Sequence, residues 1–417
     1  MIKRAAAWLS SERNYLLACA GLALLLRLVY VLKTGAGSLS PDAYDWMNTG
    51  WSVASGNGFG GSWRPPGYAF FLAAVFSVFG KSVIAAKVIQ TILSAATVWI
   101  CYRTAAELFD ALTARITAAL LAYYPYFIAY SADLLSETFL TFILAAAVYR
   151  VVRAAAAPST RNLAFAGLLI GCAALTKSVV LPFFLLACAW LWWRTGRFRA
   201  GFLAGAFSLL VILPWSMRNY LHFSGGYVMP VSTPWFTLYG SACDEALLDE
   251  NTGEIDKGPG VAEVNQFLPS DWNYVGSLPL PERDKYCKEK ALSWIRNNPG
   301  KYAWLLYRRT LHLWRLYPVI AYRWQKWAAM ATSGLYIPLA AAGFFLALPA
   351  FRKTSLLLAL LVSYTAVYIP FAVTLRYRVP ADPYFIMFAA CALAEGWRRL
   401  RGLPPGESCA KKPLEEA

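Results

Sequence analysis

Long apolar segments separated by short polar connections make up most of the 417-residue chain. A helix needs about 20 predominantly apolar residues to cross the hydrocarbon core of a bilayer. Segments near this length recur along the chain, so we predict an all-α polytopic membrane protein with about ten transmembrane helices. The predicted spans are 15–33, 82–108, 116–132, 134–152, 162–176, 178–193, 200–217, 330–349, 355–373 and 381–397.

Two further apolar stretches do not fit this count. Residues 66–80 are about 15 long, which is too short to span comfortably. Residues 301–318 carry four basic residues among aromatic ones. An interfacial helix favours such a mixture, whereas a spanning helix tolerates it poorly. We therefore predict two external interfacial helices.

Lysine and arginine gather in every second connection between the predicted spans. By the positive-inside rule these connections are cytoplasmic, which places both termini inside. The residues are Lys3, Arg4, Arg13, Arg103, Arg115, Arg150, Arg153, Arg161, Arg194, Arg197, Arg199, Arg352, Lys353, Arg398, Arg399 and Arg401. We expect an inner (plasma) membrane location, with the active site facing the periplasm or exterior.

The same pattern divides the chain into three parts. Residues 1–217 form an N-terminal transmembrane module whose first external loop, 34–81, carries the candidate catalytic residues. Residues 218–329 hold most of the remaining polar sequence and form a small external loop subdomain. Residues 330–417 supply the last transmembrane helices and a cytoplasmic tail.

Composition narrows the class of protein. Hydrophobic residues make up 58% of the chain and charged residues 15%, with a mean hydropathy of +0.44, which excludes an ordinary soluble domain. The net charge of +16 fits cytoplasmic loops and lipid phosphates. No nucleic-acid-binding motif accompanies it, so we expect no nucleic acid partner. The cysteines form no CxxC motif, and the sequence leaves open whether Cys243 and Cys287 of the external loop pair.

Unusual polar residues gather at the external ends of the predicted spans. A transporter would carry such charges in the middle of its spans, whereas an enzyme that meets a lipid substrate at the outer interface would carry them here. These residues are Asp42, Asp45, Arg64, Tyr68, Asp133, Glu137, Lys177, Arg218, Asn219, His222, Arg376 and Arg378.

Each candidate acid has two or more interpretations. Asp42 follows Pro41 and is either the N-cap of a short helix or a catalytic base. Asp45, one turn further, is a metal ligand, a contact for the acceptor or a solvated side chain. Glu137 opens an apolar run, where it either complements the helix dipole or functions with Asp45 in acceptor or metal binding.

The candidate cations are Arg64, Lys177, Arg376 and Arg378. Arginine can bind a phosphate through two parallel hydrogen bonds. The alternatives are a surface anchor at Arg64, a lysine that reaches the interface at Lys177, and headgroup contacts at the arginine pair. We predict that these cations bind the phosphate of a lipid substrate.

At these residues the chain resembles bacterial members of the GT-C superfamily of membrane glycosyltransferases, in the protein-mannosyltransferase/aminoarabinose-transferase-like group. The resemblance covers most of the chain and depends on the order of several short elements. These are the Asp42 loop, Arg64-Pro65-Pro66-Gly67-Tyr68, Ser136-Glu137-Thr138, Thr176-Lys177, Pro214-Trp215-Ser216-Met217-Arg218-Asn219 and Arg376-Tyr377-Arg378-Val379-Pro380. The family often has an acid directly after the first Asp or a Tyr four residues on, where this chain has Ala43 and Trp46.

The resemblance implies inverting transfer of a sugar from a polyprenyl-phosphate donor to an acceptor at the external face. It matches Asp42 with the general base and Glu137 with the second acidic site, and it makes Arg64, Lys177, Arg376 and Arg378 candidates for the donor phosphate. The acceptor and the need for a divalent metal ion stay open. The alternative functions are another external-face lipid-dependent enzyme, such as a glycan polymerase or ligase, and a lipid or solute transporter.

Overall fold

A computed structural model describes residues 10–37, 39–60, 64–223, 234–247, 269–316, 323–406 and 409. Within these ranges the regular structure consists of helices, which confirms the predicted all-α class. The α-helices are α2 (Glu12–Thr34), α3 (Pro41–Ala54), α4 (Gly67–Phe79), α5 (Val83–Leu108), α6 (Ala111–Ala122), α7 (Pro125–Ser131), α8 (Ser136–Ala156), α9 (Thr160–Thr176), α10 (Leu181–Thr195), α11 (Phe198–His222), α12 (Trp235–Tyr239), α14 (Trp272–Ser277), α15 (Leu280–Asn297), α16 (Pro299–Leu313), α17 (Arg323–Met330), α18 (Ser333–Leu346), α19 (Phe351–Tyr368) and α20 (Asp382–Leu400). Three short 3₁₀ helices are η1 (Ser178–Val180), η2 (Leu348–Ala350) and η3 (Leu375–Arg378).

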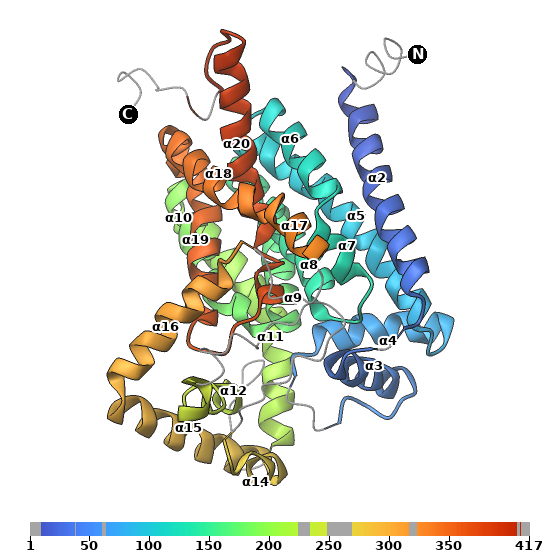
Figure 1. Ribbon diagram of the computed structural model, residues 1–417, viewed down its shortest axis with the longest axis vertical. Coiled ribbons are helices and arrows are strands. Elements are labelled where there is room, and N and C mark those ends of the chain that lie inside the picture. The colour runs from blue at the N-terminus through green and yellow to red at the C-terminus, as the bar shows by residue number, and fades with distance from the viewer. Residues whose placement is uncertain are drawn as a thin grey trace.

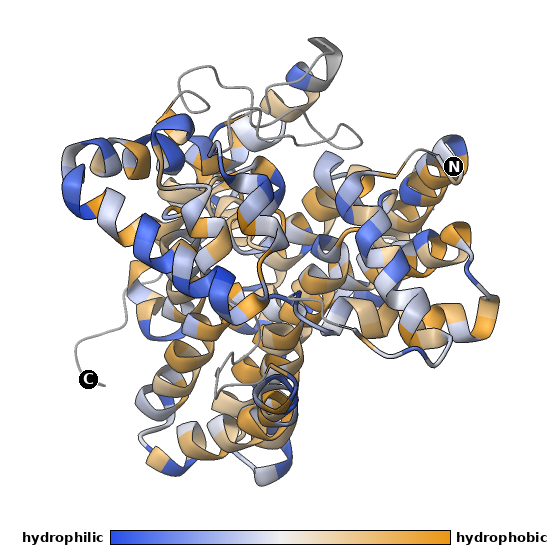
Figure 2. Ribbon diagram, turned by 90° about the horizontal axis from the view of Figure 1, so that it is seen from below, coloured by the Kyte–Doolittle hydropathy of each residue, from blue (hydrophilic) through white to orange (hydrophobic). Residues whose placement is uncertain are grey.

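The long helices run along one axis of the molecule (Figure 1). The start of α2 and the end of α20 lie at the upper end, as expected if both termini share one side of the membrane. Helices α3, α4, α12, α14 and α15 gather at the lower end, which the charge pattern assigns to the exterior. Figure 2 shows that most of the ribbon is hydrophobic, with hydrophilic residues grouped on a few helices and turns.

Seven helical segments of the described chain are long and apolar enough to cross a membrane, and they coincide with seven of the predicted spans. Two other predicted spans are also helices, but they are slightly too short or too charged to count among these seven segments. Helix α9 has 17 residues, and α20 has 19 residues with charged side chains at both ends. The chain is therefore a multi-pass membrane protein, as predicted.

The predicted span at 116–132 is two helices rather than one. Helix α6 ends at Ala122, and α7 begins at Pro125, which occupies the first helical position. Proline has no N–H and clashes with the preceding turn, so it favours a break here. The guanidinium of Arg27, from α2, is fully buried and donates to the carbonyl oxygens of Ala122 at 2.8 Å and Leu121 at 3.0 Å. It thereby satisfies the carbonyl of Ala122, which the end of the helix leaves open, and adds a donor to the carbonyl of Leu121, which also accepts from the backbone N–H of Tyr123.

Replacing Arg27 with methionine is expected to destabilise the protein by about 1–3 kcal/mol, because the carbonyl group of Ala122 would be buried without this donor. The measurement is the midpoint of thermal unfolding in detergent. Arg103→Met is the control, since the Arg103 side chain is 40% exposed and makes one ion pair of 3.5 Å. Equal midpoints for the two variants would show that the Arg27 contacts contribute little.

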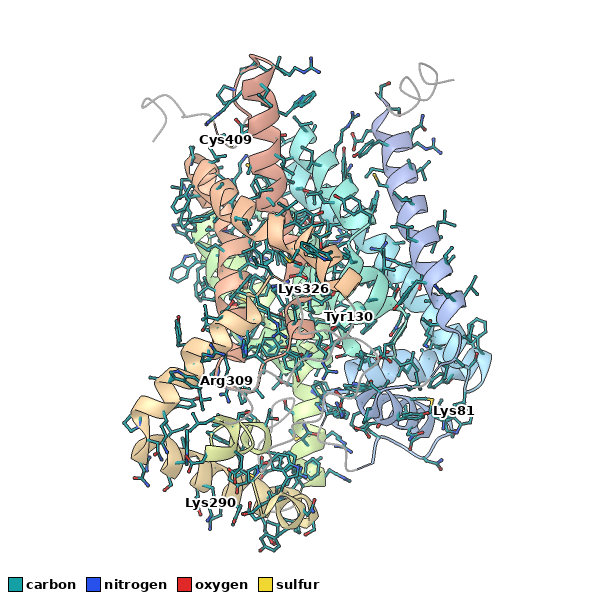
Figure 3. The ribbon with its side chains drawn as sticks, viewed as in Figure 1. Lys81, Tyr130, Lys290, Arg309, Lys326 and Cys409 are labelled. Carbon is teal, nitrogen blue, oxygen red and sulfur yellow. The ribbon has the colours of Figure 1, made fainter. Side chains whose placement is uncertain are left out.

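The two predicted interfacial segments are helices α4 and α16. Helix α4 lies across the long helices (Figure 1) and buries one face, including Tyr68, Leu72 and Phe76. Helix α16 belongs to a group at the lower end, formed with α12, α14 and α15, which we call the loop subdomain. Its Arg309, labelled in Figure 3, is buried and donates to the carbonyl oxygens of Ser241 at 2.6 Å and Pro370 at 3.0 Å. This arginine joins the loop subdomain to the connection between α19 and α20.

The loop subdomain has its own small apolar core around Leu238, Val275 and Cys287. Cys243 belongs to a separate apolar cluster. Both cysteines are buried with free thiols, so the structure contains no Cys243–Cys287 disulfide.

Candidate active site

Helix α3 presents Asp42 at the lower end of the molecule. Ser40 is the N-cap of this helix and accepts a hydrogen bond from the backbone N–H of Ala43, while Pro41 takes the first helical position. Ser40 therefore caps the helix, and the interpretation of Asp42 as the N-cap residue is wrong. The Asp42 carboxylate remains available for side-chain contacts.

Two arginines bind the Asp42 carboxylate, each through a different oxygen. Arg64 Nη2 lies 2.8 Å from Oδ1, and Arg376 Nη2 lies 2.6 Å from Oδ2. Burial alone would raise the pKa of Asp42, but the positive charges of Arg376 and Arg64 outweigh it and hold the pKa well below its usual range. Asp42 is thus ionised throughout the neutral pH range. Arg64 also binds Asp45 through Nε at 2.6 Å.

Arg376 connects Asp42 to the second acid, Glu137. Glu137 stands at the start of α8 with a side chain only 3% exposed, and it accepts a hydrogen bond of 2.8 Å from Lys177 Nζ. Arg376 Nε lies 3.7 Å from the same oxygen. Burial would lower the pKa of Lys177, but the carboxylate of Glu137 reverses this effect and raises it above its usual range. The two acids therefore share one continuous network of charge.

We call Asp42, Asp45, Glu137, Arg64, Lys177 and Arg376 the acid–cation cluster. These residues come from α3, the segment before α4, the start of α8, the end of α9 and helix η3. Three carboxylates face three cations, so the formal charges of the cluster cancel. An anionic ligand that enters the cluster must compete with a carboxylate for its cations.

Close backbone packing explains how two distant segments of this cluster meet. Gly67 lies against Thr176, and a Cβ at position 67 would come within 2.9 Å of the Thr176 Cα. Only a glycine allows this approach. The contact brings the Arg64-Pro65-Pro66 corner to the end of α9, where Lys177 follows.

The connection before α3 is anchored by Lys87 and Asp133. Lys87 is buried and donates to the carbonyl oxygens of Gly35 and Ala36. Ser40 donates to the Asp133 carboxylate at 3.4 Å. These contacts fix the position from which Asp42 faces the cluster.

Arg378, predicted beside Arg376 as a phosphate contact, lies outside the acid–cation cluster. Its side chain is 1% exposed and forms an ion pair of 2.9 Å with the fully buried Asp382. Arg378 also donates to the carbonyl oxygens of Leu313 and Arg315, and Tyr124 donates to Asp382 at 2.7 Å. The structure therefore gives Arg378 the geometry of a tie between α7, α16 and α20.

Sequence reasoning missed Asp382, and one signal could have revealed it. Asp382 follows Arg378 by four residues at the start of the last predicted span. That spacing places opposite charges on one side of a helical turn.

The acidic residues do not fit a metal site. The described part of the chain contains no group of three Asp, Glu, His or Cys side chains arranged to hold an ion. Asp42 and Asp45 both bind Arg64, whereas a divalent cation is held by several oxygen ligands that face it.

Comparison with known proteins supports the resemblance seen in the sequence: the chain is similar to a family of mannosyltransferases and shares its fold with a solved oligosaccharyltransferase. The model of the dolichyl-phosphate-mannose-protein mannosyltransferase family matches residues 63–217. This stretch includes Arg64, Glu137 and Lys177. No curated protein matches the sequence.

Solved structures of an archaeal oligosaccharyltransferase share the fold. The oligosaccharyltransferase of Archaeoglobus fulgidus in its apo form has a TM-score of 0.57 and 15% identity, covering 94% of this chain and 52% of that protein. The same oligosaccharyltransferase with an inhibitory peptide and a dolichol-phosphate has a TM-score of 0.55 and 16% identity, covering 95% and 52%. ArnT of Cupriavidus metallidurans bound to undecaprenyl phosphate has a TM-score of 0.42 and 14% identity, covering 92% and 78%. This chain spans about half the length of the oligosaccharyltransferase.

Proposed function

We propose that this protein transfers a sugar from a polyprenyl-phosphate donor to an acceptor at the external, periplasmic face of the inner membrane. The observation that carries the proposal is the acid–cation cluster, in which Asp42 is bound by Arg64 and Arg376 at one end of the membrane helices. The matched family of dolichyl-phosphate-mannose-protein mannosyltransferases supports a lipid-phosphate donor. So does the dolichol-phosphate in the compared oligosaccharyltransferase structure.

The chemistry assigned to Asp42 is that of a general base. Its carboxylate accepts the proton of the acceptor hydroxyl while the hydroxyl oxygen forms a bond to the anomeric carbon of the sugar. The bond between that carbon and the phosphate oxygen breaks at the same time, and configuration is inverted. The lipid phosphate leaves as an anion and needs cations rather than a general acid.

Arg64, Lys177 and Arg376 are the cations proposed to bind the donor phosphate. All three are paired with carboxylates in the cluster, so a phosphate adds negative charge to a neutral site. Sharing Arg376 with the phosphate would weaken its bond to Asp42. The carboxylate would then become more basic when the donor is in place, which links base strength to donor binding.

Glu137 and Asp45 are proposed to act near the acceptor. Glu137 sets the positions of Lys177 and Arg376 through its two contacts. Asp45, with a side chain 54% exposed, lies where an acceptor arriving from outside would meet it.

Replacing Arg376 with alanine is expected to weaken donor binding by about 10- to 100-fold, since a charge-assisted hydrogen bond contributes about 1.5–3 kcal/mol. The measurement is the KM for the donor and the KM for the acceptor in the same assay. Lys81→Ala is the control, because Lys81 also lies near the external loop but contacts Asn48. Equal increases in both KM values would argue against a phosphate contact.

The experiment that tests the function is transfer by the purified protein in lipid nanodiscs from radiolabelled polyprenyl-phosphate sugars to membrane acceptors. We expect transfer from at least one donor, and its identity would name the sugar. Absence of transfer from every donor, in the presence of total membrane extract as acceptor, would favour another lipid-dependent enzyme or a transporter.

A further inference from the structure

Two buried tyrosines stand on the inner side of the acid–cation cluster. Tyr364 and Tyr368 lie one turn apart at the lower end of α19, with exposures of 3% and 7% and ring centroids 5.1 Å apart. Among the residues that the structure describes, neither hydroxyl has a hydrogen-bond partner apart from the hydroxyl of the other tyrosine. Both hydroxyl groups are therefore buried with unused donor and acceptor capacity.

The position of Tyr368 places these hydroxyls next to the cluster. Its ring stacks on that of Tyr377 with centroids 4.9 Å apart and planes 9° apart. Lys177 Nζ lies 5.8 Å from the centroid of Tyr368 and 4.7 Å from that of Tyr377. Because Lys177 also binds Glu137, the pair of tyrosines continues the cluster toward the membrane interior.

The free-energy cost of these hydroxyls calls for an explanation. A buried polar group without a partner costs about 1–3 kcal/mol in a protein interior, and phenylalanine would fill the same volume without this cost. Thr374, two residues before Arg376, has a buried hydroxyl in the same condition. Unsatisfied groups that gather beside a reactive centre indicate a polar ligand that completes their hydrogen bonds.

Charge distinguishes which part of a donor these groups fit. A phosphate requires cations, which the proposed function assigns to Arg64, Lys177 and Arg376, whereas Tyr364 and Tyr368 carry no charge. Hydroxyls both donate and accept, which matches the hydroxyls of an uncharged sugar. Building on the proposed function, we propose that Tyr364 and Tyr368 form the subsite for the sugar of the donor and hydrogen-bond its hydroxyl groups.

The test compares two ligands on the full-length protein in nanodiscs. One is undecaprenyl phosphate, and the other is undecaprenyl phosphate carrying glucose, galactose or mannose. We expect the wild type to bind one glycosylated form more tightly than the plain phosphate. Tyr364→Phe and Tyr368→Phe are each expected to weaken binding of that glycosylated form by about three- to tenfold, as for the loss of a neutral hydrogen bond. Binding of the plain phosphate is expected to stay unchanged.

Tyr384→Phe is the matched control, because Tyr384 is 1% exposed on α20 and its hydroxyl also lacks a partner among the described residues. This control is expected to bind both ligands as the wild type does. An equal loss for both ligands in the α19 variants would overturn the sugar assignment and place the hydroxyls on the phosphate. If the α19 variants bind both ligands as the wild type does, the hydroxyls do not contact the donor, and the sugar assignment is also overturned. A wild type that binds neither ligand would refute the proposed function itself.

Discussion

Replacing Asp42 with asparagine is expected to lower the rate of sugar transfer by roughly 10²–10⁴-fold, the usual contribution of a general base. Asparagine keeps the shape and one acceptor oxygen for Arg64 or Arg376, and its amide cannot take a proton at neutral pH. The loss is therefore expected in kcat, with a smaller change in the KM for the donor. The measurement is steady-state transfer from the donor that the wild type uses.

Asp45→Asn is the matched control for this experiment. Both acids bind Arg64, but Asp42 also binds Arg376, and the side chains are 34% and 54% exposed. We expect Asp45→Asn to alter kcat by less than about tenfold, since Asp45 is proposed to act near the acceptor rather than to take the proton, and an exposed ion pair contributes about 0–1 kcal/mol. Near-wild-type turnover in Asp42→Asn would sink the assignment of the base.

Replacing Asp382 with asparagine is expected to lower the free energy of unfolding by about 3–5 kcal/mol, the usual cost of breaking a buried ion pair from one side. Arg378 and Asp382 are at most 1% exposed, so the substitution leaves a guanidinium in the interior without its carboxylate. Tyr124 also loses its charged acceptor. The measurement is unfolding in detergent by heat or denaturant, with retained helix content as the check on folding.

Asp244→Asn serves as the control for stability. Its ion pair with Lys301 has side chains 66% and 51% exposed, and such pairs contribute about 0–1 kcal/mol. A second comparison is the double variant Arg378→Met with Asp382→Leu, which removes both charges and is expected to recover part of the loss. A single Asp382→Asn variant as stable as Asp244→Asn would mean that the buried pair does not hold the helices together.

The consequences for activity follow from helix η3. Arg376 and Arg378 stand on this one turn, so the tie made by Arg378 also sets where Arg376 meets Asp42. We expect Asp382→Asn to lose activity even under conditions where it remains folded.

The sequence predicts the class of fold and the residue types of the site better than it predicts where helices break and which distant residues come into contact. Segment length and composition are sufficient for helices such as α2 and α5, because crossing a bilayer imposes a minimum apolar length. They fail at 116–132, where Pro125 ends the run and Arg27 stabilises the break from a helix far back in the chain. A window of hydropathy cannot register such a contact.

The site shows the same division. Asp42 and Arg376 are recognisable one at a time, as polar residues beside apolar runs, but they are 334 positions apart and only folding reveals their bond. Arg376 and Arg378 look equivalent in sequence, yet a single 3₁₀ turn sends one to the cluster and the other to Asp382. The direction in which each side chain leaves this turn depends on the helices packed around it, and a local sequence pattern does not contain those helices.

Arg27 also bears on how the protein is made. Its helix α2 is synthesised before α6, whose carbonyl oxygens receive the guanidinium. A charged arginine at the centre of an inserting helix costs about 2.5–3.5 kcal/mol on the translocon scale. Helix α2 has to tolerate that cost until ribosomes have delivered some 90 further residues, with carbonyl acceptors 94 and 95 positions downstream. Assembly of the N-terminal helices is therefore ordered in time, with α2 completed in the bilayer only once α6 has arrived beside it.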